Sequence, residues 1–342
     1  MLEFPELFEE SGYINMPGII ELGYPFTFVT GARRTGKTFG GLKYNLSHGI
    51  KFVYLRRSQT EIDACKTPAL SPFMDINQEL GYDIQVKPLA KNVIGFYDMG
   101  KEMKNLIAPG IALTTLHNVR GISGAEYSQI FYDEFIPEKI ARPIKGEFDA
   151  WSNAYETLNG NRELKGGKPM QFICCANSNM AANPIFMGLG LVRILERMKK
   201  DHQVYYADKG RGILIVNVEG SPISQKKKTS ALGKLTKGTD FARMAYDNEY
   251  AFDDFSNIES RSLREYKPYK QVGEICVYKH KSRNEYYISE HTAGAPVKYG
   301  SSEREIEAFS RGAGVLRDAY LSGRIYFENY LTKVLFLKYT NS

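Results

Sequence analysis

Residues 26–39 read F-T-F-V-T-G-A-R-R-T-G-K-T-F, and this stretch decides the fold class. Residues 26–30 are apolar, β-branched or aromatic, which predicts a short buried strand. Residues 31–38 have the spacing G-x-x-x-x-G-K-T, and a helix is expected over residues 36–46. The glycines let backbone N–H groups turn toward phosphate oxygens, and the N-terminus of the helix favours an anion. A strand, this loop and a helix in succession predict a nucleotide site in an α/β domain.

ATP with Mg²⁺ is the expected ligand of this loop. Lys37 is expected to reach the β- and γ-phosphates, and the Thr38 hydroxyl is expected to hold Mg²⁺. A chance Gly-rich turn is the alternative, which the preceding strand and the following helix disfavour. The predicted cofactor-binding residues are Gly31, Ala32, Arg33, Arg34, Thr35, Gly36, Lys37 and Thr38.

A second apolar run, S-Q-I-F-Y-D-E at residues 128–134, ends in two adjacent carboxylates. In P-loop enzymes an aspartate at such a strand end holds Mg²⁺ together with the loop threonine, so Asp133 is a predicted metal ligand. Glu134 is the predicted general base for an attacking water. An ordinary acidic turn is the alternative, but a position about a hundred residues after the loop favours the catalytic interpretation.

Polar residues also follow two other predicted strands. Residues 170–176 form an apolar run that ends at Asn177, which we expect to sense the γ-phosphate, the alternative being an asparagine that caps a turn. Arg56 and Arg57 follow the strand expected at residues 51–55. Their interpretation stays open between a ligand-binding edge and a solvated loop.

Composition sets broad limits on the chain. It has 342 residues, 43% of them hydrophobic, and a formal net charge of +6, which permits a polyanionic partner without demonstrating one. The four cysteines lack C-x-x-C spacing and are expected to be buried thiols in a reducing compartment. No signal peptide is expected at the glutamate-rich N-terminus, and no membrane span is expected anywhere.

We expect a P-loop ATPase domain with a mainly parallel sheet over residues 1–205, a lysine-rich linker region over 206–245 and a small α+β domain over 246–342. Residues 83–107 alternate as in a hairpin that projects from the core, and another strand is expected at 111–116. A strand is also expected at 212–218, and whether it joins the main sheet stays open. Closing strands are expected over residues 324–339.

Four motifs together carry a family resemblance: G-A-R-R-T-G-K-T, R-G-I-S-G, I-F-Y-D-E and F-I-C-C-A-N-S. The chain resembles the genome-packaging ATPases of small, protein-primed podophages, which are relatives of large terminases and belong to the additional-strand, catalytic-glutamate branch of P-loop ATPases. The layout of the whole chain matches, and the specific motifs lie within residues 31–178.

The resemblance implies a homo-oligomeric ring, a pentamer in that family, that uses ATP hydrolysis to drive double-stranded DNA through the portal of a procapsid. It implies an RNase H-like, inactive nuclease-type C-terminal domain, which agrees with the lack of a convincing carboxylate set there. It also implies that Arg120 and Arg162 complete the ATP site of a neighbouring subunit. A structural RNA is a possible further partner, and the expected location is the host cytoplasm, at the portal vertex during packaging.

Two other functions stay open at this point. One is a terminase-like motor that also cuts DNA, and the other is a nucleotide-gated, DNA-binding assembly factor without repeated turnover. A small-molecule kinase is disfavoured because Glu134 is placed to activate water and because the second domain is large.

Overall fold

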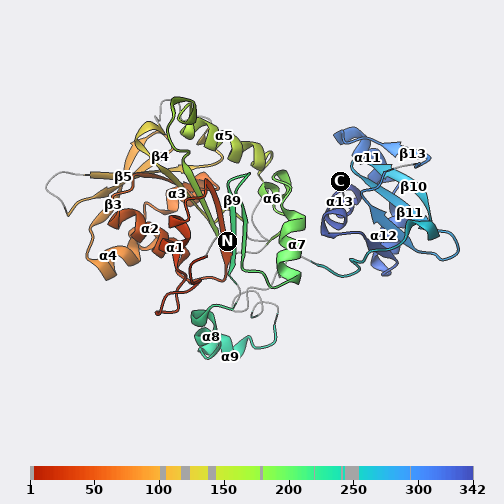
Figure 1. Cartoon of the computed structure of the whole chain (residues 1–342), viewed down its shortest axis with the longest axis horizontal. Coiled ribbons are helices and arrows are strands. Elements are labelled where there is room, and N and C mark those ends of the chain that lie inside the picture. The colour runs from red at the N-terminus through yellow and green to blue at the C-terminus, as the bar shows by residue number, and fades with distance from the viewer. Residues whose placement is uncertain are drawn as a thin grey trace. The chain divides into compact units, whose positions relative to one another are not determined.

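A computed structural model describes residues 4–100, 105–116, 124–137, 144–177, 180–218, 220–239, 242, 254–292 and 294–341. The chain forms two compact units (Figure 1). The larger unit comprises residues 1–188 with 200–252, and the smaller comprises residues 189–199 with 253–342. This division differs from the expected boundaries, since residues 206–245 belong with the larger unit and the helical segment 189–199 belongs with the smaller one.

Among the described residues of the larger unit, nine strands form one sheet. In spatial order they are β3 (Ile84–Ala90), β4 (Val93–Asp98), β5 (Asn105–Ala112), β2 (Phe52–Arg56), β6 (Gln129–Asp133), β7 (Gln171–Ala176), β1 (Phe26–Gly31), β9 (Ile213–Val218) and β8 (Tyr205–Asp208). The strands from β5 to β9 in this order are parallel, and antiparallel pairs join β3, β4 and β8 at the two edges. The larger unit is therefore an α/β domain with a mostly parallel sheet, as predicted.

Strand β7 lies between the P-loop strand β1 and the acidic strand β6. Thr30 of β1 pairs with Ala176 of β7, and Asp133 of β6 pairs with Cys175 of β7. This is the additional-strand order that the resemblance implies. Because the three strands are parallel, their carboxyl ends lie at one edge of the sheet, where α/β proteins bind ligands.

Helices cover both faces of this sheet because successive side chains on a strand point to opposite sides. Val29 packs in one buried cluster with side chains of α1 (Met16–Glu21), α2 (Lys37–Ser47) and α4 (Met74–Leu80). The adjacent Phe28 instead contacts Trp151 of α5 (Glu147–Asn159) and Phe186 of α6 (Pro184–Gly188). Figure 1 shows α5 apart from α1, α2 and α4. Helix α3 (Gln59–Ala64) follows β2.

Two expectations for this sheet are wrong. The hairpin of residues 83–107 does not project from the core, since β4 is largely buried and pairs with β5, which in turn pairs with β2. The strand expected at 111–116 begins earlier, at Asn105, and ends at Ala112. The polar positions that resemble an exposed hairpin belong to β3, an edge strand whose residues are mostly exposed or half-buried.

The expected linker region contains regular structure that belongs to the larger unit. All six residues of β9 are buried, and β9 pairs in parallel with β1, which answers the open question about this strand. Two short helices follow, α8 (Pro222–Lys228) and α9 (Ala231–Leu235). Residues 240–253 lie outside the described residues, apart from Ala242.

The smaller unit has its own sheet, which in the described ranges has five strands in the order β13-β10-β11-β12-β14. These are β13 (Val297–Tyr299), β10 (Tyr266–Val272), β11 (Ile275–His280), β12 (Tyr286–Ser289) and β14 (Ile325–Phe327). Its helices include α7 (Val192–Lys200), α11 (Glu303–Arg311), α12 (Gly314–Leu321) and α13 (Tyr330–Thr340). A second, smaller sheet domain is thus present at the C-terminal end.

The closing strands expected over residues 324–339 are largely wrong, because residues 330–340 form the helix α13. Asn329 caps this helix by accepting from the Thr332 backbone N–H, while the Thr332 hydroxyl accepts from the Asn329 N–H. The aromatic and branched residues that favour a strand here are instead buried on several sides of a helix. A strong cap and tertiary burial therefore override local β propensity.

All four cysteines, Cys65, Cys174, Cys175 and Cys276, are free and buried, as expected. Across the described part of the chain, none of the helices combines the length and apolar character that crossing a bilayer requires.

Candidate functional site

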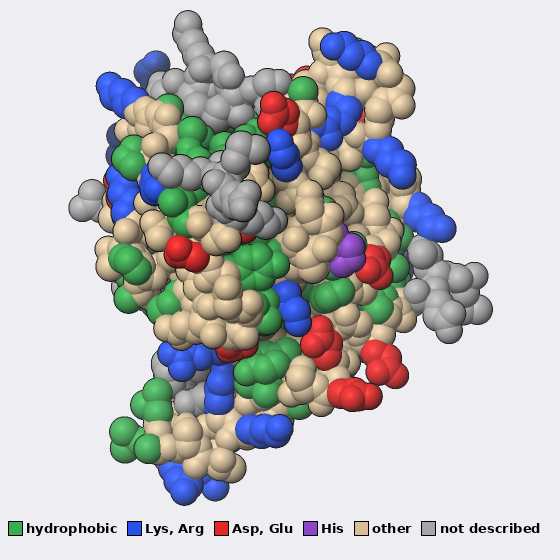
Figure 2. Space-filling model, turned by 90° about the vertical axis from the view of Figure 1, so that its left-hand side faces the viewer, with side chains coloured by type: hydrophobic (Ala, Val, Ile, Leu, Met, Phe, Trp, Pro, Cys, Tyr) green, Lys and Arg blue, Asp and Glu red, His purple; other side chains and the backbone are tan. Residues whose placement is uncertain are grey.

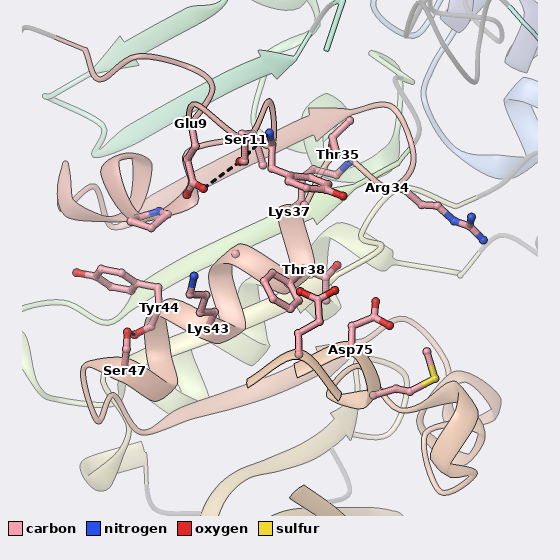
Figure 3. A pocket seen from close by; sticks show the side chains of 18 of the residues that line it. Glu9, Ser11, Arg34, Thr35, Lys37, Thr38, Lys43, Tyr44, Ser47 and Asp75 are labelled. Carbon is pink, nitrogen blue, oxygen red and sulfur yellow. Dashed lines mark hydrogen bonds between the residues drawn. The ribbon is translucent and has the colours of Figure 1, made fainter. Parts of the chain in front are cut away.

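The P-loop connects the end of β1 to the start of α2 and lines a cavity of about 860 Å³. Gly36 is the N-cap of α2 with φ of 93°, a left-handed conformation that glycine adopts without steric cost. Figure 3 shows Thr35, Lys37 and Thr38 at one part of the cavity, and Lys43, Tyr44 and Ser47 further along α2. The cavity thus extends beyond the loop itself.

Lys37 is buried at the base of the loop, with 4% of the residue exposed. Its Nζ donates to the carbonyl oxygens of Gly31 at 2.9 Å and Ala32 at 2.8 Å, and to the Thr35 hydroxyl at 3.2 Å. Burial lowers the pKa of Lys37 from 10.5 to about 8, although nearby Glu134 opposes this shift. The Lys37 ammonium is buried and held only by neutral oxygens. An anionic ligand such as a phosphate would therefore favour its charged form.

Thr38 and Asp133 meet across the edge of the sheet. The Thr38 hydroxyl donates to Oδ1 of Asp133 at 2.9 Å. The other oxygen, Oδ2, accepts from the Tyr54 hydroxyl at 2.9 Å and from Nη1 of Arg56 at 3.0 Å. A hydroxyl and a carboxylate are hard oxygen donors of the kind that Mg²⁺ prefers, so this pair fits the expected metal.

Glu134 follows Asp133 and has a left-handed backbone, with φ of 58°. Its carboxylate accepts from the side-chain amide of Asn177, and its Oε2 also accepts from the Asn177 backbone N–H at 3.3 Å. Burial and the adjacent Asp133 raise the pKa of Glu134, while Lys37 and Arg56 oppose this effect. A carboxyl with a raised pKa beside a phosphate-type loop has the character of a general base.

Two residues that hold Asp133 were missed as site residues by sequence reasoning. Arg56 was noted only as a cation at a strand end, and Tyr54 gave no signal because it sits within an apolar strand. Neighbouring Arg57 has a different role, since it forms a buried bidentate ion pair with Glu147 at 2.6 and 3.0 Å. Neither arginine is simply solvated, so the solvated-loop alternative is wrong.

Of the two arginines expected to act between subunits, the structure describes only Arg162. Arg120 lies outside the described residues. Arg162 follows α5, and its Nη2 donates to the carbonyl oxygens of Gly124 at 2.7 Å and Tyr127 at 2.5 Å. These carbonyls precede β6, whereas Glu134 follows it. Arg162 is therefore bound at the opposite end of β6 from the candidate base.

The structure brings together five predicted residues, which are Lys37, Thr38, Asp133, Glu134 and Asn177. A parallel sheet with the additional strand, a glycine-bounded loop before α2 and an acidic strand end beside it place the larger unit in the P-loop class of α/β domains. Over residues 8–281 the chain matches the podovirus DNA encapsidation protein (Gp16) family, and it belongs to that family. The predicted family is thereby confirmed.

Sequence and structural similarity to known proteins supports this assignment. The chain is 28% identical over 260 residues to the DNA packaging protein of Bacillus phage phi29, a match that covers 74% of this chain and 70% of that protein. The DNA packaging protein of Bacillus phage B103 is 29% identical over 241 residues, covering 69% of this chain and 67% of that protein. The fold is similar to a chain of the bacteriophage phi29 genome packaging motor assembly, with a TM-score of 0.69, 22% identity and coverage of 97% of this chain and 98% of that chain.

Proposed function

We propose that this chain hydrolyses MgATP and uses the reaction to translocate double-stranded DNA into a procapsid. The observation that carries the proposal is the hydrogen bond between Thr38 and Asp133, with buried Lys37 and the Asn177-bound Glu134 beside it. Membership of a DNA encapsidation family supports DNA as the cargo. The chemistry needs a phosphate cradle, two metal-holding oxygens and a base, and these five residues provide candidates for each role.

In this proposal Thr38 and Asp133 hold Mg²⁺, which when bound neutralises developing charge on the phosphate oxygens. Lys37 binds the phosphates, and Tyr54 and Arg56 orient Asp133 through its second oxygen. Glu134 accepts a proton from the attacking water. Asn177 donates to both carboxylate oxygens of Glu134, and its proposed role is to sense the γ-phosphate from the end of β7.

The proposed assembly is a homo-oligomeric ring, with five subunits as the family resemblance implies. The family resemblance implies that Arg162 completes the ATP site of a neighbouring subunit. It lies beyond the amino end of β6, a strand of five residues, so roughly 16 Å of strand separates it from the position of Glu134. It is therefore too far away to act in the site of its own subunit. Arg120 has the same proposed role on the resemblance alone.

The proposed partners are double-stranded DNA, the portal of a procapsid and other copies of this chain, with a structural RNA as a further candidate. The proposed site of action is the portal vertex of a procapsid in the infected host cell. The larger unit is proposed to be the ATPase and the smaller unit a nucleic-acid or assembly domain.

ATP turnover measured against duplex DNA concentration at two salt concentrations tests the proposal. We expect multiple turnovers that DNA stimulates, with a stimulation that falls steeply as salt rises because phosphate contacts release counterions. Lys37→Ala should abolish nucleotide binding and turnover. A single turnover that DNA does not change would favour the nucleotide-gated assembly factor, and nicking that depends on Mn²⁺ would favour the terminase-like nuclease.

A further inference from the structure

Helix α8 lies directly on the P-loop. Nζ of Lys227 donates to the backbone carbonyl oxygens of Arg33 at 3.0 Å and of Arg34 at 3.3 Å. The chain arrives there from β9, whose last residue, Val218, pairs with Gly31 at the start of the loop. Two residues of the loop are therefore tied to a segment almost 200 positions later in the sequence.

Helices α8 and α9 form one closely packed hairpin, which protrudes from the larger unit in Figure 1. A Cβ on Gly233 of α9 would lie 2.4 Å from the Lys227 carbonyl oxygen and 2.6 Å from that of Lys228, so only glycine permits this approach. At the other end of α8, the Cβ of Pro222 would lie 3.1 Å from a Cβ on Gly12. Because Gly233 packs directly against the last turn of α8, we expect the two helices to move together.

The carbonyls that Lys227 contacts belong to the same peptide units as the N–H groups of Arg34 and Thr35. In a trans peptide the C=O and the N–H point in opposite directions. A P-loop that turns these N–H groups inward toward a phosphate therefore turns the carbonyls outward, where a cation can bind them. A charged donor on the carbonyl also polarises the peptide and strengthens its N–H as a donor.

We propose that Lys227 couples phosphate binding in the P-loop to docking of the α8–α9 hairpin on that loop. The inference rests on the proposed nucleotide site and adds a regulatory contact to it. Each event favours the other, because coupling between two binding equilibria is reciprocal. Burial and the Arg34 guanidinium lower the pKa of Lys227, so a nearby anion would favour its charged form.

The hairpin carries a surface that such docking would reposition. Residues 220–239 contain five lysines and no acidic residue. Leu232 is 51% exposed and Leu235 is 81% exposed. Figure 2 shows Lys or Arg side chains together with hydrophobic ones at the bottom of the view. A nucleotide-dependent change in the hairpin would thus reposition a basic, partly apolar surface.

Hydrogen exchange of the full-length protein, with and without Mg²⁺ and a non-hydrolysable ATP analogue, tests the proposal. In the wild type we expect the analogue to slow exchange of the backbone amides of residues 222–235. In Lys227→Gln this slowing should be lost, and the analogue should bind about threefold to tenfold more weakly. Lys227→Arg should restore both effects, since it keeps a cationic donor. Lys226→Gln is the matched control, because the Lys226 side chain is exposed on the same helix, and it should behave as the wild type.

The outcomes separate this proposal from the proposed function. If the analogue binds neither the wild type nor the controls, the nucleotide site itself is wrong. If the wild type binds it but residues 222–235 exchange at an unchanged rate, the coupling is wrong. The coupling is also wrong if the analogue slows hydrogen exchange equally in Lys227→Gln and in the wild type and binds both with comparable affinity. Unchanged thermal unfolding of Lys227→Gln would show that any loss of protection does not come from misfolding.

Discussion

Oδ1 of Asp133 accepts a hydrogen bond of 2.9 Å from the hydroxyl of Thr38, a residue 95 positions earlier in the chain. Thr38 lies in the first turn of the helix after the P-loop, and Asp133 ends a strand that is separated from the P-loop strand by β7. The contact therefore exists only when the parallel sheet is assembled in this order. Tyr54 and Arg56 hold the second oxygen of Asp133, which leaves Oδ1 directed at Thr38.

Replacing the candidate base should separate binding from chemistry. Glu134→Gln should retain MgATP binding, because Lys37, Thr38 and Asp133 are unchanged, but should reduce turnover by about 10²- to 10⁴-fold. Steady-state turnover and nucleotide titration of the same preparation measure the two quantities. Near-wild-type turnover in this variant would show that Glu134 is not the base.

The same substitution should change how the stability of the folded protein depends on pH. The pKa of Glu134 is raised in the folded state by burial and by Asp133, so the fold favours the protonated carboxyl. That stability is fully present below the pKa of the unfolded chain and is lost as the pH rises through the folded pKa. Thermal unfolding should therefore show the melting temperature of Glu134→Gln rising relative to that of the wild type between about pH 4 and pH 7.

The exposed residue Glu10 provides the control for this measurement. Glu10→Gln should leave the melting temperature nearly unchanged at both pH values, because a surface carboxylate interacts weakly in water. A stability difference between Glu134→Gln and the wild type that does not change in favour of the variant between about pH 4 and pH 7 would contradict the assigned direction of the pKa shift.

Nucleotide binding should take up protons above pH 8. The pKa of Lys37 is lowered to about 8 by burial, so part of the population has a neutral amine above that pH. Bound phosphates favour the charged ammonium and so draw a proton from solution. Calorimetric titrations in two buffers with different ionisation enthalpies should show uptake at about pH 8.5 that fades toward pH 6.5. The same uptake in Lys37→Arg, whose guanidinium stays charged, would assign it to another group.

Arg57 should act on stability and not on nucleotide chemistry. Its guanidinium forms two hydrogen bonds with Glu147, and both side chains are almost fully buried. Arg57→Met leaves a buried carboxylate unpaired and should lower the free energy of unfolding by about 3–5 kcal/mol. The double variant Arg57→Met with Glu147→Leu should recover much of that loss, measured by denaturant unfolding. If Arg57→Met alone has wild-type stability, the ion pair is not formed in solution.

Mixed assemblies should reveal an arginine that acts between subunits. Glu134→Gln subunits keep Arg162, and Arg162→Ala subunits keep the base, so each should be nearly inactive alone. Mixtures should regain part of the turnover wherever an intact base faces an intact neighbouring arginine, because a guanidinium at the transferring phosphate is worth orders of magnitude in rate. Mixtures that co-assemble yet stay inactive would leave Arg162 with its local role of binding the carbonyls of Gly124 and Tyr127.

The sequence by itself determined the elements whose signals are local. The P-loop, the buried strand before it and the helix after it follow from glycine spacing and apolar periodicity within residues 26–47. The strands that deliver Asp133 and Asn177 to one edge were also predictable, because each is a short apolar run with a polar residue at its end. These features depend on residues adjacent in the chain, so no long-range information is needed to find them.

Only the tertiary structure decided which distant groups meet. The contacts of Asp133 with Tyr54 and Arg56, and of Lys227 with the loop carbonyls, join residues 77 to 194 positions apart. Pairing and burial also placed β9 beside β1 and made residues 330–340 a helix where local propensity favours a strand. The physical reason is that side-chain burial and strand pairing depend on neighbours that the local sequence does not specify. The residues that would carry the chemistry could therefore be predicted from the sequence. The residues that position and restrain them could not.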